Sequence, residues 1–344
     1  MRATLKDVAR ASGCSFQAVS AILGARAHEF SVELRDRVVA AADQLGYRPS
    51  SSARSMRQGR TGCVALVRGT APTLNTVSDQ VLFGITSELE SHDLHLALLT
   101  LDDATLTSDV ELNKILRQWM ADGLLIKYDT RIPARLSDVL ARFKIPAIWI
   151  NSRHDCDCVL PDDHGAGVRA TRHLIALGHR RIAYADYAYN LSDPEEHYSA
   201  SDRYAGYREA MREAQLEPAL IAGDKQVPED GRVGYSLAQL ARPDRPTAIV
   251  CNSAWVAYPF WHAAMRLGLA VPADLSLFTF EVRRQNNLGP ELSQLLVPDY
   301  EVGRTATAML VDKLRDPEAR HQPRAIPFKM IVGETCAPAR EVYA

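Results

Sequence analysis

The sequence predicts an all-α helix-turn-helix headpiece followed by a larger α/β body with two sheets. Residues 4–48 hold three short amphipathic helical patterns, with a tight turn between the first two. From residue 62 onward, apolar strand-like runs alternate with helical patterns, which is typical of parallel sheets covered by helices on both faces. The strand-like runs are too many for one compact sheet of this kind, so two sheets are expected.

The composition is that of an ordinary folded protein. The 344 residues are 47% hydrophobic and 24% charged, which is enough apolar sequence for two or three cores. The six cysteines are scattered, and no apolar run has the length of a membrane span. No signal peptide is recognised either, so a cytoplasmic location without membrane contact is expected.

Charge is unevenly divided along the chain. The formal net charge is −2, but residues 1–60 carry ten Lys and Arg against five Asp and Glu. This part therefore has a net charge of +5 and the remaining residues −7. A basic module before an acidic body favours contact between the first part and a polyanion, although chance variation in surface charge is an alternative.

The starts of the headpiece helices are recognisable. Thr4 is expected to cap the first helix, with Asp7 three residues later to complete a capping box. Gly13 supplies the positive φ that ends this helix, and Ser15 and Ser31 are expected to cap the second and third. The apolar side chains that recur at helical spacing and should face the core are Leu5, Val8, Ala9, Val19, Ile22, Leu23, Leu34, Val38, Ala42 and Leu45.

The outward face of the second helix then carries Phe16, Gln17, Ser20 and Ala21. In a helix-turn-helix unit, the N-terminal residues of the second helix meet base edges in the major groove of DNA. Gln17 can bond an adenine edge, and Phe16 and Ala21 can contact a thymine methyl group. A plain three-helix bundle, in which these exposed side chains have no role, is the alternative.

Residues 46–62 are rich in Ser and Arg and, on their own, are expected to form a flexible linker. A two-turn helix in this segment would present Ala53, Met56 and Arg57 along one side. An apolar wedge flanked by arginine is what insertion into a minor groove requires. The arginines expected to neutralise phosphates are Arg54, Arg57 and Arg60.

Two stretches carry a family resemblance, "TLKDVARASGCSFQAVSAILG" and "VVAAADQLGYRPSSSARSM". They resemble the N-terminal part of the lactose-repressor (LacI/GalR) family of bacterial transcription regulators. The resemblance implies a DNA-binding headpiece over residues 1–48, a hinge helix over 49–60 with Met56 as its lever, and a homodimer bound to a pseudo-palindromic DNA operator. Thr4 and Ser15 are counted with the outward face of the second helix as DNA-contacting residues.

The strand-like runs of the body are "CVALV", "LHLALLTL", "GLLIKY", "AIWIN", "RIAYAD", "AIVCN", "LSLFTF" and "QLLVP". Helical patterns between them cover residues 79–92, 106–121, 165–177 and 203–214. No tetramerising heptad follows "GETCAPAREVYA", so a dimer is preferred over a tetramer.

The family resemblance extends through the body, where "DGLLI", "HLIALGHRRIAYAD" and "GETCAPA" look like segments of the family's effector domain. It implies that residues 61–344 form a two-lobed domain similar to periplasmic binding proteins. Its ligand would lie in a cleft at the C-terminal ends of the strands. The expected lobe 1 covers about 61–160 and 292–322, and the expected lobe 2 covers about 161–291 and 323–344.

Polar residues at strand ends are the candidate ligand contacts. By the resemblance, Arg203 in "DRYAGY" is the ligand-clamping arginine, whose planar fork can hold adjacent hydroxyls or a carboxylate. Asn252 in "CNS" matches a family asparagine, whereas Ser253, Thr279 and Glu281 depart from the usual pattern. The remaining candidates are Asp162 or Asp163 in "LPDDHG", and Trp255 and Tyr258, which either stack on a sugar ring or belong to the core.

We therefore expect a transcription regulator, a repressor, whose DNA affinity is controlled by a small carbohydrate-like effector. The alternatives are a ligand-independent regulator or architectural protein of the same fold, and an enzyme. The phosphate-loop, dinucleotide and nucleophile-elbow motifs are missing, so no catalytic residue and no cofactor are expected. "HDCDC", at residues 154–158, offers atoms that zinc accepts, but Cys-x-Cys is not a standard zinc spacing and no metal site is expected.

Overall fold

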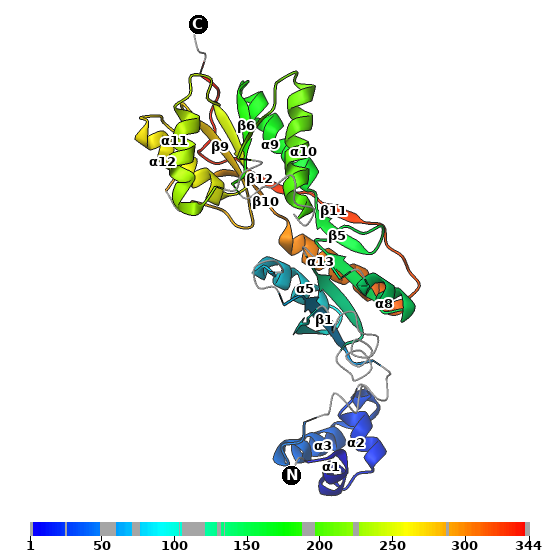
Figure 1. Ribbon diagram of the computed structural model, residues 1–344. Coiled ribbons are helices and arrows are strands. Elements are labelled where there is room, and N and C mark those ends of the chain that lie inside the picture. The colour runs from blue at the N-terminus through cyan, green and yellow to red at the C-terminus, as the bar shows by residue number, and fades with distance from the viewer. Residues whose placement is uncertain are drawn as a thin grey trace.

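The computed structural model of the chain describes residues 3–24, 26–48, 60–70, 76–102, 104, 121–128, 132–133, 135–187, 197–222, 227–286 and 289–340. They form a helical headpiece and two α/β lobes, each built on a six-stranded sheet (Figure 1). The predicted fold class is therefore confirmed.

The predicted helix caps of the headpiece are confirmed. Thr4 and Asp7 form the capping box, in which the Thr4 backbone N–H donates to Asp7 Oδ2 at 2.9 Å. Gly13 ends the first helix with a φ of 65°, and Ser15 Oγ accepts the Ala18 N–H at 3.1 Å. The headpiece consists of α1 (Leu5–Ser12), α2 (Phe16–Ile22), a 3-10 turn (Ala27–Glu29) and α3 (Val32–Gln44).

Lobe 1 contains a fully parallel sheet with the strand order β11-β5-β4-β3-β1-β2. Two helices, α5 (Asp79–Glu90) and α13 (Asp299–Arg315), cover one face, and α8 (Leu136–Arg142) packs on the other. The predicted helix at 106–121 lies almost wholly outside the described residues. The strands are β1 (Cys63–Arg68), β2 (His95–Thr100), β3 (Gly123–Lys127), β4 (Ala147–Ile150), β5 (Cys158–Pro161) and β11 (Arg324–Ile326).

Lobe 2 contains the second sheet, with the order β12-β10-β9-β8-β6-β7, in which β12 alone of the described strands runs antiparallel to its neighbour. The helices α9 (Asp163–Ala176) and α10 (Tyr198–Glu213) cover one face, and α11 (Arg232–Leu240) and α12 (Ala254–Arg266) cover the other (Figure 1). The strands are β6 (Ile182–Ala185), β7 (Ala219–Ile221), β8 (Ala248–Cys251), β9 (Ser276–Glu281), β10 (Ser293–Leu296) and β12 (Lys329–Ile331).

The sheet pairing corrects two of the expected lobe boundaries. A return to lobe 1 at residue 292 is too early, because β10 pairs with β9 in lobe 2. A final return to lobe 2 at residue 323 is also too early, because β11 pairs with β5 in lobe 1. A short apolar run indicates a strand, but the sheet that receives it is decided by partners distant in the sequence. The three-residue strands β7, β11 and β12 are too short to be recognised by their pattern.

In lobe 2, α9 and α10 cross so closely that only glycine fits at the crossing. A Cβ atom on Gly167 would lie 2.2 Å from the carbonyl oxygen of Arg203, and a Cβ atom on Gly206 would lie 2.1 Å from that of His164. A similar approach occurs in lobe 1, where Gly84 of α5 lies against the backbone of α13. Each lobe therefore contains a helix pair whose backbones are in direct contact.

We expect Gly206→Ala to lower the free energy of unfolding by about 2 kcal/mol or more, because the added methyl group forces α9 and α10 apart. Gly234→Ala on α11 is the matched control, since an added Cβ there meets nothing within 4 Å. The control should be neutral or stabilising, because alanine favours a helix by about 1 kcal/mol relative to glycine. Urea unfolding followed by circular dichroism measures both, and equal effects would contradict the proposed close crossing.

Candidate functional site

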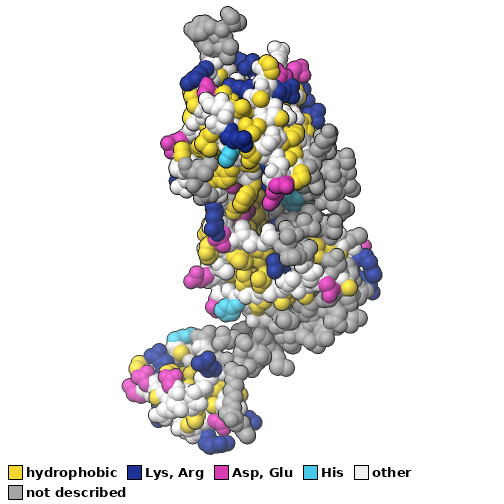
Figure 2. Space-filling model, turned by 60° about the vertical axis from the view of Figure 1, so that its left-hand side comes forward, with side chains coloured by type: hydrophobic (Ala, Val, Ile, Leu, Met, Phe, Trp, Pro, Cys, Tyr) yellow, Lys and Arg dark blue, Asp and Glu magenta, His cyan; other side chains and the backbone are white. Residues whose placement is uncertain are grey.

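The N-terminal half of α2 exposes side chains that can reach another molecule. Phe16 is 46% exposed and Gln17 is exposed, whereas Ser20 is half-buried. Because Ser15 caps the helix, Phe16 and Gln17 lie at its positive end, where backbone N–H groups favour anions such as phosphate. Basic and acidic side chains both lie on the visible face of the headpiece (Figure 2). Of the side chains predicted to face outward from α2, Phe16 and Gln17 are therefore the ones that the structure leaves exposed.

The prediction that Ala21 faces outward is wrong. Ala21 is only 6% exposed and is buried together with Val19 and Ile22. After α2, the chain folds back so that the 3-10 turn at Ala27–Glu29 contacts this helix. The helical pattern of α2 alone does not predict this contact. A buried Ala21 side chain is not available for contact with a base.

The predicted wedge of the linker lies outside the described residues. The wedge comprises Ala53, Met56 and Arg57, and the neighbouring Arg54 also lies outside the described residues. The DNA contacts of these four residues remain predictions. Arg60 is described, and its Nη2 donates to the carbonyl oxygen of Leu314 in α13 at 2.9 Å.

A buried ion pair forms the centre of the second candidate site, at the end of lobe 2 that faces lobe 1. Arg203 Nε, in the second turn of α10, donates to Asp163 Oδ1, in the first turn of α9, at 2.7 Å. The Asp163 side chain is 1% exposed and the Arg203 side chain 13%. A buried charge pair is tolerated only with good hydrogen-bond geometry, so the crossing of α9 and α10 must hold these two side chains in place.

The remaining surroundings of the guanidinium group come from the strand ends of lobe 2. Arg203 Nη1 lies 3.3 Å from both the carbonyl oxygen and the Oδ1 atom of Asn252, which follows β8. Tyr184 in β6 donates to the same Oδ1 at 3.1 Å. The guanidinium carbon lies 4.8 Å from the ring centre of Phe280 and 5.6 Å from that of Phe328. Arg203 is thus fixed by charge, hydrogen bonds and cation–π contacts together.

Glu281 ends β9 and accepts the backbone N–H of Ala254, the first residue of α12. Burial raises the pKa of Glu281 to about 7, although the Ala254 N–H and the Arg203 guanidinium act in the opposite direction. The carboxyl group is therefore partly protonated at neutral pH. The structure brings Glu281, Arg203, Asn252 and Asp163 to one end of lobe 2.

Two other sequence candidates have different surroundings. Asp162 is the N-cap of α9, and its Oδ1 accepts the Gly165 N–H at 2.9 Å. Of the two adjacent aspartates, Asp163 is therefore the one that contacts Arg203. The Trp255 side chain is 76% exposed on the first turn of α12, so it is not a core residue. Tyr258 is half-buried and its hydroxyl donates to Gln285 at 3.4 Å.

Sequence reasoning missed two unsatisfied polar atoms of lobe 2. Asp163 Oδ2 and Thr279 Oγ1 are buried and have no hydrogen-bond partner among the residues that the structure describes. Such orphaned atoms are uncommon in folded proteins, and bound ligand or water frequently satisfies them. Thr279 was noted in the sequence only as a departure from the family pattern, and the position of its hydroxyl could not be inferred.

The two lobes contact each other through ion pairs and hydrogen bonds next to this site. Arg153, after β4 of lobe 1, pairs with Asp202 of α10. Tyr198 of α10 donates to Asn151 of lobe 1 at 2.7 Å. A further ion pair joins Arg283, after β9, to Asp79 of α5. Groups in the first turns of α10 therefore contact both lobe 1 and the Arg203 site.

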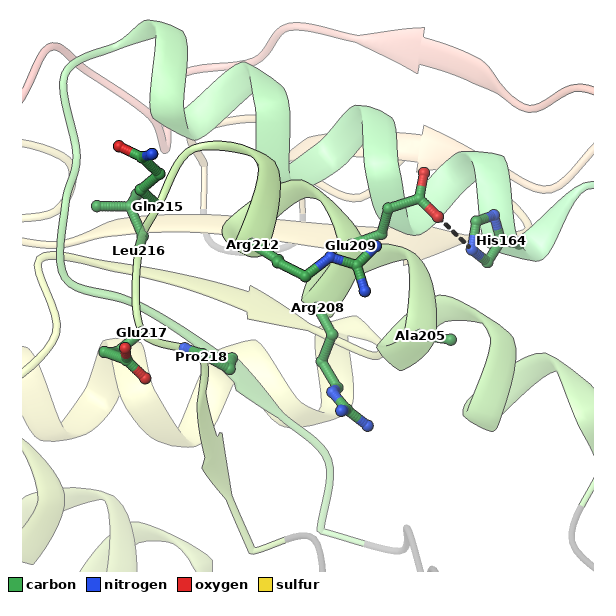
Figure 3. Close-up of a pocket in the computed structure, with 9 residues that line it drawn as sticks. All are labelled: His164, Ala205, Arg208, Glu209, Arg212, Gln215, Leu216, Glu217 and Pro218. Atoms are coloured by element: carbon green, nitrogen blue, oxygen red, sulfur yellow. Dashed lines mark ion pairs between the residues drawn. The ribbon is translucent and has the colours of Figure 1, made fainter.

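A separate groove of roughly 750 Å³ lies on the outside of lobe 2, along α10 (Figure 3). It is lined by Ala205, Arg208 and Arg212, and His164 pairs with Glu209 at its edge at 3.3 Å. Arg203 does not line it, so this groove is distinct from the site between the lobes.

Within the described ranges, no group of three or more His, Cys, Asp or Glu side chains is arranged to hold a metal ion. In the "HDCDC" segment, the His154 ring instead stacks on Trp149 at 4.0 Å between ring centres, and Cys158 Sγ donates to the His154 carbonyl at 3.2 Å. None of the described helices is both long and apolar enough to cross a membrane.

Two family models match this chain. Residues 4–50 match the bacterial regulatory proteins of the lacI family, and residues 171–336 match a periplasmic binding protein-like domain. The ribose operon repressor of Haemophilus influenzae is 26% identical over 99% of both chains. The HTH-type transcriptional repressor PurR of Escherichia coli O139:H28 is 31% identical, over 94% of this chain and 93% of the relative.

Solved structures show the same fold. The lac repressor dimer bound to operator and the anti-inducer ONPF matches 98% of this chain and 100% of its own, with a TM-score of 0.75 and 20% identity. A complex of the transcriptional regulator CelR with cellobiose matches 97% of this chain and 100% of its own, with a TM-score of 0.61 and 23% identity. The relative at 31% identity over nearly the whole length, together with the headpiece match, shows that the chain belongs to the LacI family of bacterial regulatory proteins.

Proposed function

We propose that this protein is a cytoplasmic, homodimeric transcriptional repressor that binds a pseudo-palindromic DNA operator and responds to a small carbohydrate-like effector. The observation that carries the proposal is the buried group of Arg203, Asp163 and Asn252 at the strand ends of lobe 2, in a chain that also has a capped, exposed α2. No catalytic residue, cofactor or metal is assigned.

The DNA contacts are proposed for the headpiece. The N-terminal end of α2 presents Gln17 and Phe16, the positions that meet base edges when such a helix enters a major groove. Gln17 has the donor and acceptor that pair with the N7 and N6 atoms of adenine, and the Phe16 ring supplies apolar contact to thymine. Thr4, Ser15 and Ser20 are proposed to contact the phosphates or sugars beside them.

The chemistry of the second site favours a neutral polyhydroxyl ligand. Asp163 already balances the charge of Arg203, so an anionic ligand would add an uncompensated charge. The orphaned Asp163 Oδ2 can accept a hydrogen bond from a ligand hydroxyl group. Solved relatives named as complexes with ribose or cellobiose support a sugar as the ligand class.

Control of DNA binding requires the effector to bind two arrangements of the lobes with different affinity. The first turns of α10 provide a physical connection, because they carry Arg203 as well as Tyr198 and Asp202, which contact lobe 1. We propose that an effector at Arg203 changes these contacts between the lobes and thereby the DNA affinity.

A ligand-independent regulator of the same fold is the second candidate. It is favoured by one observation: the Glu281 carboxyl group is occupied by the N-terminus of α12. This candidate predicts that no small molecule changes the DNA affinity.

We expect Gln17→Ala to reduce the preference for a specific duplex about tenfold, because a good bidentate base contact contributes about 1–3 kcal/mol of discrimination. The duplex is selected from a random pool by the unmodified protein, and binding is measured by fluorescence anisotropy beside a scrambled duplex. Gln44→Ala, an exposed position at the end of α3, is the matched control. Equal losses for both duplexes would rule out a base contact by Gln17.

We expect Arg203→Lys to weaken the effector response at least about tenfold, because lysine keeps the charge beside Asp163 but loses the planar fork. Anisotropy of the selected duplex is followed while ribose, cellobiose and a panel of other sugars and sugar acids are titrated. Arg172→Lys, in an exposed pair with Glu213, is the matched control. If no compound changes DNA binding by the unmodified protein, the ligand-independent candidate is supported instead.

Glu281 is expected to make stability depend on pH. Its pKa is about 7 in the folded chain and 4.5 ordinarily, so its stabilising contribution is fully present below about pH 4.5 and is lost as the pH rises through about 7. Relative to the unmodified protein, Glu281→Gln should therefore gain about 2 kcal/mol in unfolding free energy between pH ~5 and pH ~8. Urea unfolding at both values tests this, with the exposed Glu90→Gln as control; a constant difference would refute it.

A further inference from the structure

Thr61 and Gly62, where the chain enters lobe 1, are held by the side chain of Asp122. Asp122 Oδ1 accepts the backbone N–H of Thr61 at 2.6 Å and the Thr61 hydroxyl at 3.0 Å. Asp122 Oδ2 accepts the backbone N–H of Gly62 at 2.8 Å. One carboxylate therefore binds three donors of two consecutive residues. Hydrogen bonds to an ionised acceptor are roughly twice as strong as those between neutral groups.

Asp122 is itself fixed in the sheet of lobe 1. It directly precedes β3, and its backbone N–H donates to the carbonyl oxygen of Cys63, the first residue of β1, at 2.7 Å. Gly62 has a φ of 70°, which lets the backbone turn so that both N–H groups face the carboxylate. The contacts are part-buried, so they are less exposed to competition from water.

A second attachment is made by Arg60 at the C-terminus of α13. Its guanidinium Nη2 lies 2.9 Å from the carbonyl oxygen of Leu314, in the last turn of that helix. The last carbonyl groups of a helix lack helical partners and carry partial negative charge, so a cation is favourable there. Asp122, before β3, and Leu314, in α13, thus hold residues 60–62 from two different elements of lobe 1.

The attachment of residues 60–62 to Asp122 and Leu314 is called the anchor. It lies at the end of lobe 1 that is opposite lobe 2 (Figure 1). β1 and β3 both begin at the anchor, and their other ends point toward lobe 2. The helix α13 extends over about 25 Å between these two ends. It begins at Asp299, which accepts a hydrogen bond at 2.6 Å from Ser78, the N-cap of α5, and its last turn holds the Arg60 contact.

We propose that Asp122, together with the Leu314 carbonyl, positions the DNA-binding headpiece by fixing the point at which the preceding segment leaves lobe 1. The inference rests on the proposed function. In a dimer bound to two half-sites, fixed exit points raise the effective concentration of the second headpiece at its half-site. Contacts with a scrambled duplex tolerate many headpiece orientations and depend less on this fixed geometry. Asp122 touches no DNA and is therefore a positioning residue.

Full-length Asp122→Ala tests the inference on the duplex selected by the unmodified protein. We expect about tenfold weaker binding to the selected duplex and less than about a twofold change for the scrambled one. The slope of log affinity against log salt should not change, because no phosphate contact is removed. A protein that is merely less stable would lose active fraction, which does not alter the ratio of the two affinities. Asp138→Ala, exposed on α8, is the matched control.

Two further variants keep the test decisive if Asp122→Ala does not fold. Thr61→Val removes one donor to Asp122 and should lower the same affinity ratio by a smaller factor. Arg60→Gln should lower the ratio with an unchanged salt slope if its partner is Leu314, whereas a slope reduced by about one would indicate a phosphate contact instead. Unchanged ratios in the folded variants would overturn the inference. An unmodified protein that selects no duplex would overturn the proposed function as well.

Discussion

The close crossing of α9 and α10 determines the geometry of the site between the lobes. Gly167 touches the Arg203 carbonyl and Gly206 touches the His164 carbonyl, so neither helix can slide along the other without a clash. Asp163 lies one turn before Gly167, and Arg203 lies one turn before Gly206. The crossing therefore brings the carboxylate and the guanidinium group together at 2.7 Å. A buried ion pair with poorer geometry would cost more in desolvation than it returns in attraction.

The same helix pair connects the site with lobe 1. Because Arg203 is fixed by Asp163, Asn252 and two aromatic rings, a ligand that changes its position must also act on α10. The first turns of that helix hold the contacts with Asn151 and Arg153 of lobe 1. Packed helices have few alternative arrangements. A small displacement of the Arg203 side chain is therefore expected to move α10 as a whole.

Local rules made the headpiece predictable: caps at Thr4 and Ser15 and a helical apolar stripe depend only on nearby residues. Arg203, Asn252 and Glu281 were accessible through family resemblance and strand-end position. Ala21 was misplaced because the turn that packs on α2 comes from a later segment. The unpaired Thr279 hydroxyl and the sheet that receives β10 depend on pairing across long sequence distances, which periodicity does not encode.

Each lobe is built from segments that are distant in the sequence, and this limits how far either lobe can fold during synthesis on the ribosome. Lobe 1 lacks the covering helix α13 and the strand β11 until residues 299–326 have been made, and the sheet of lobe 2 is complete only with β12 at residues 329–331. Neither lobe can therefore finish folding before the other is nearly complete. Until then, the apolar face of β1, β3 and β4 that α13 covers is open to solvent, so the nascent chain exposes a surface of the kind that chaperones bind.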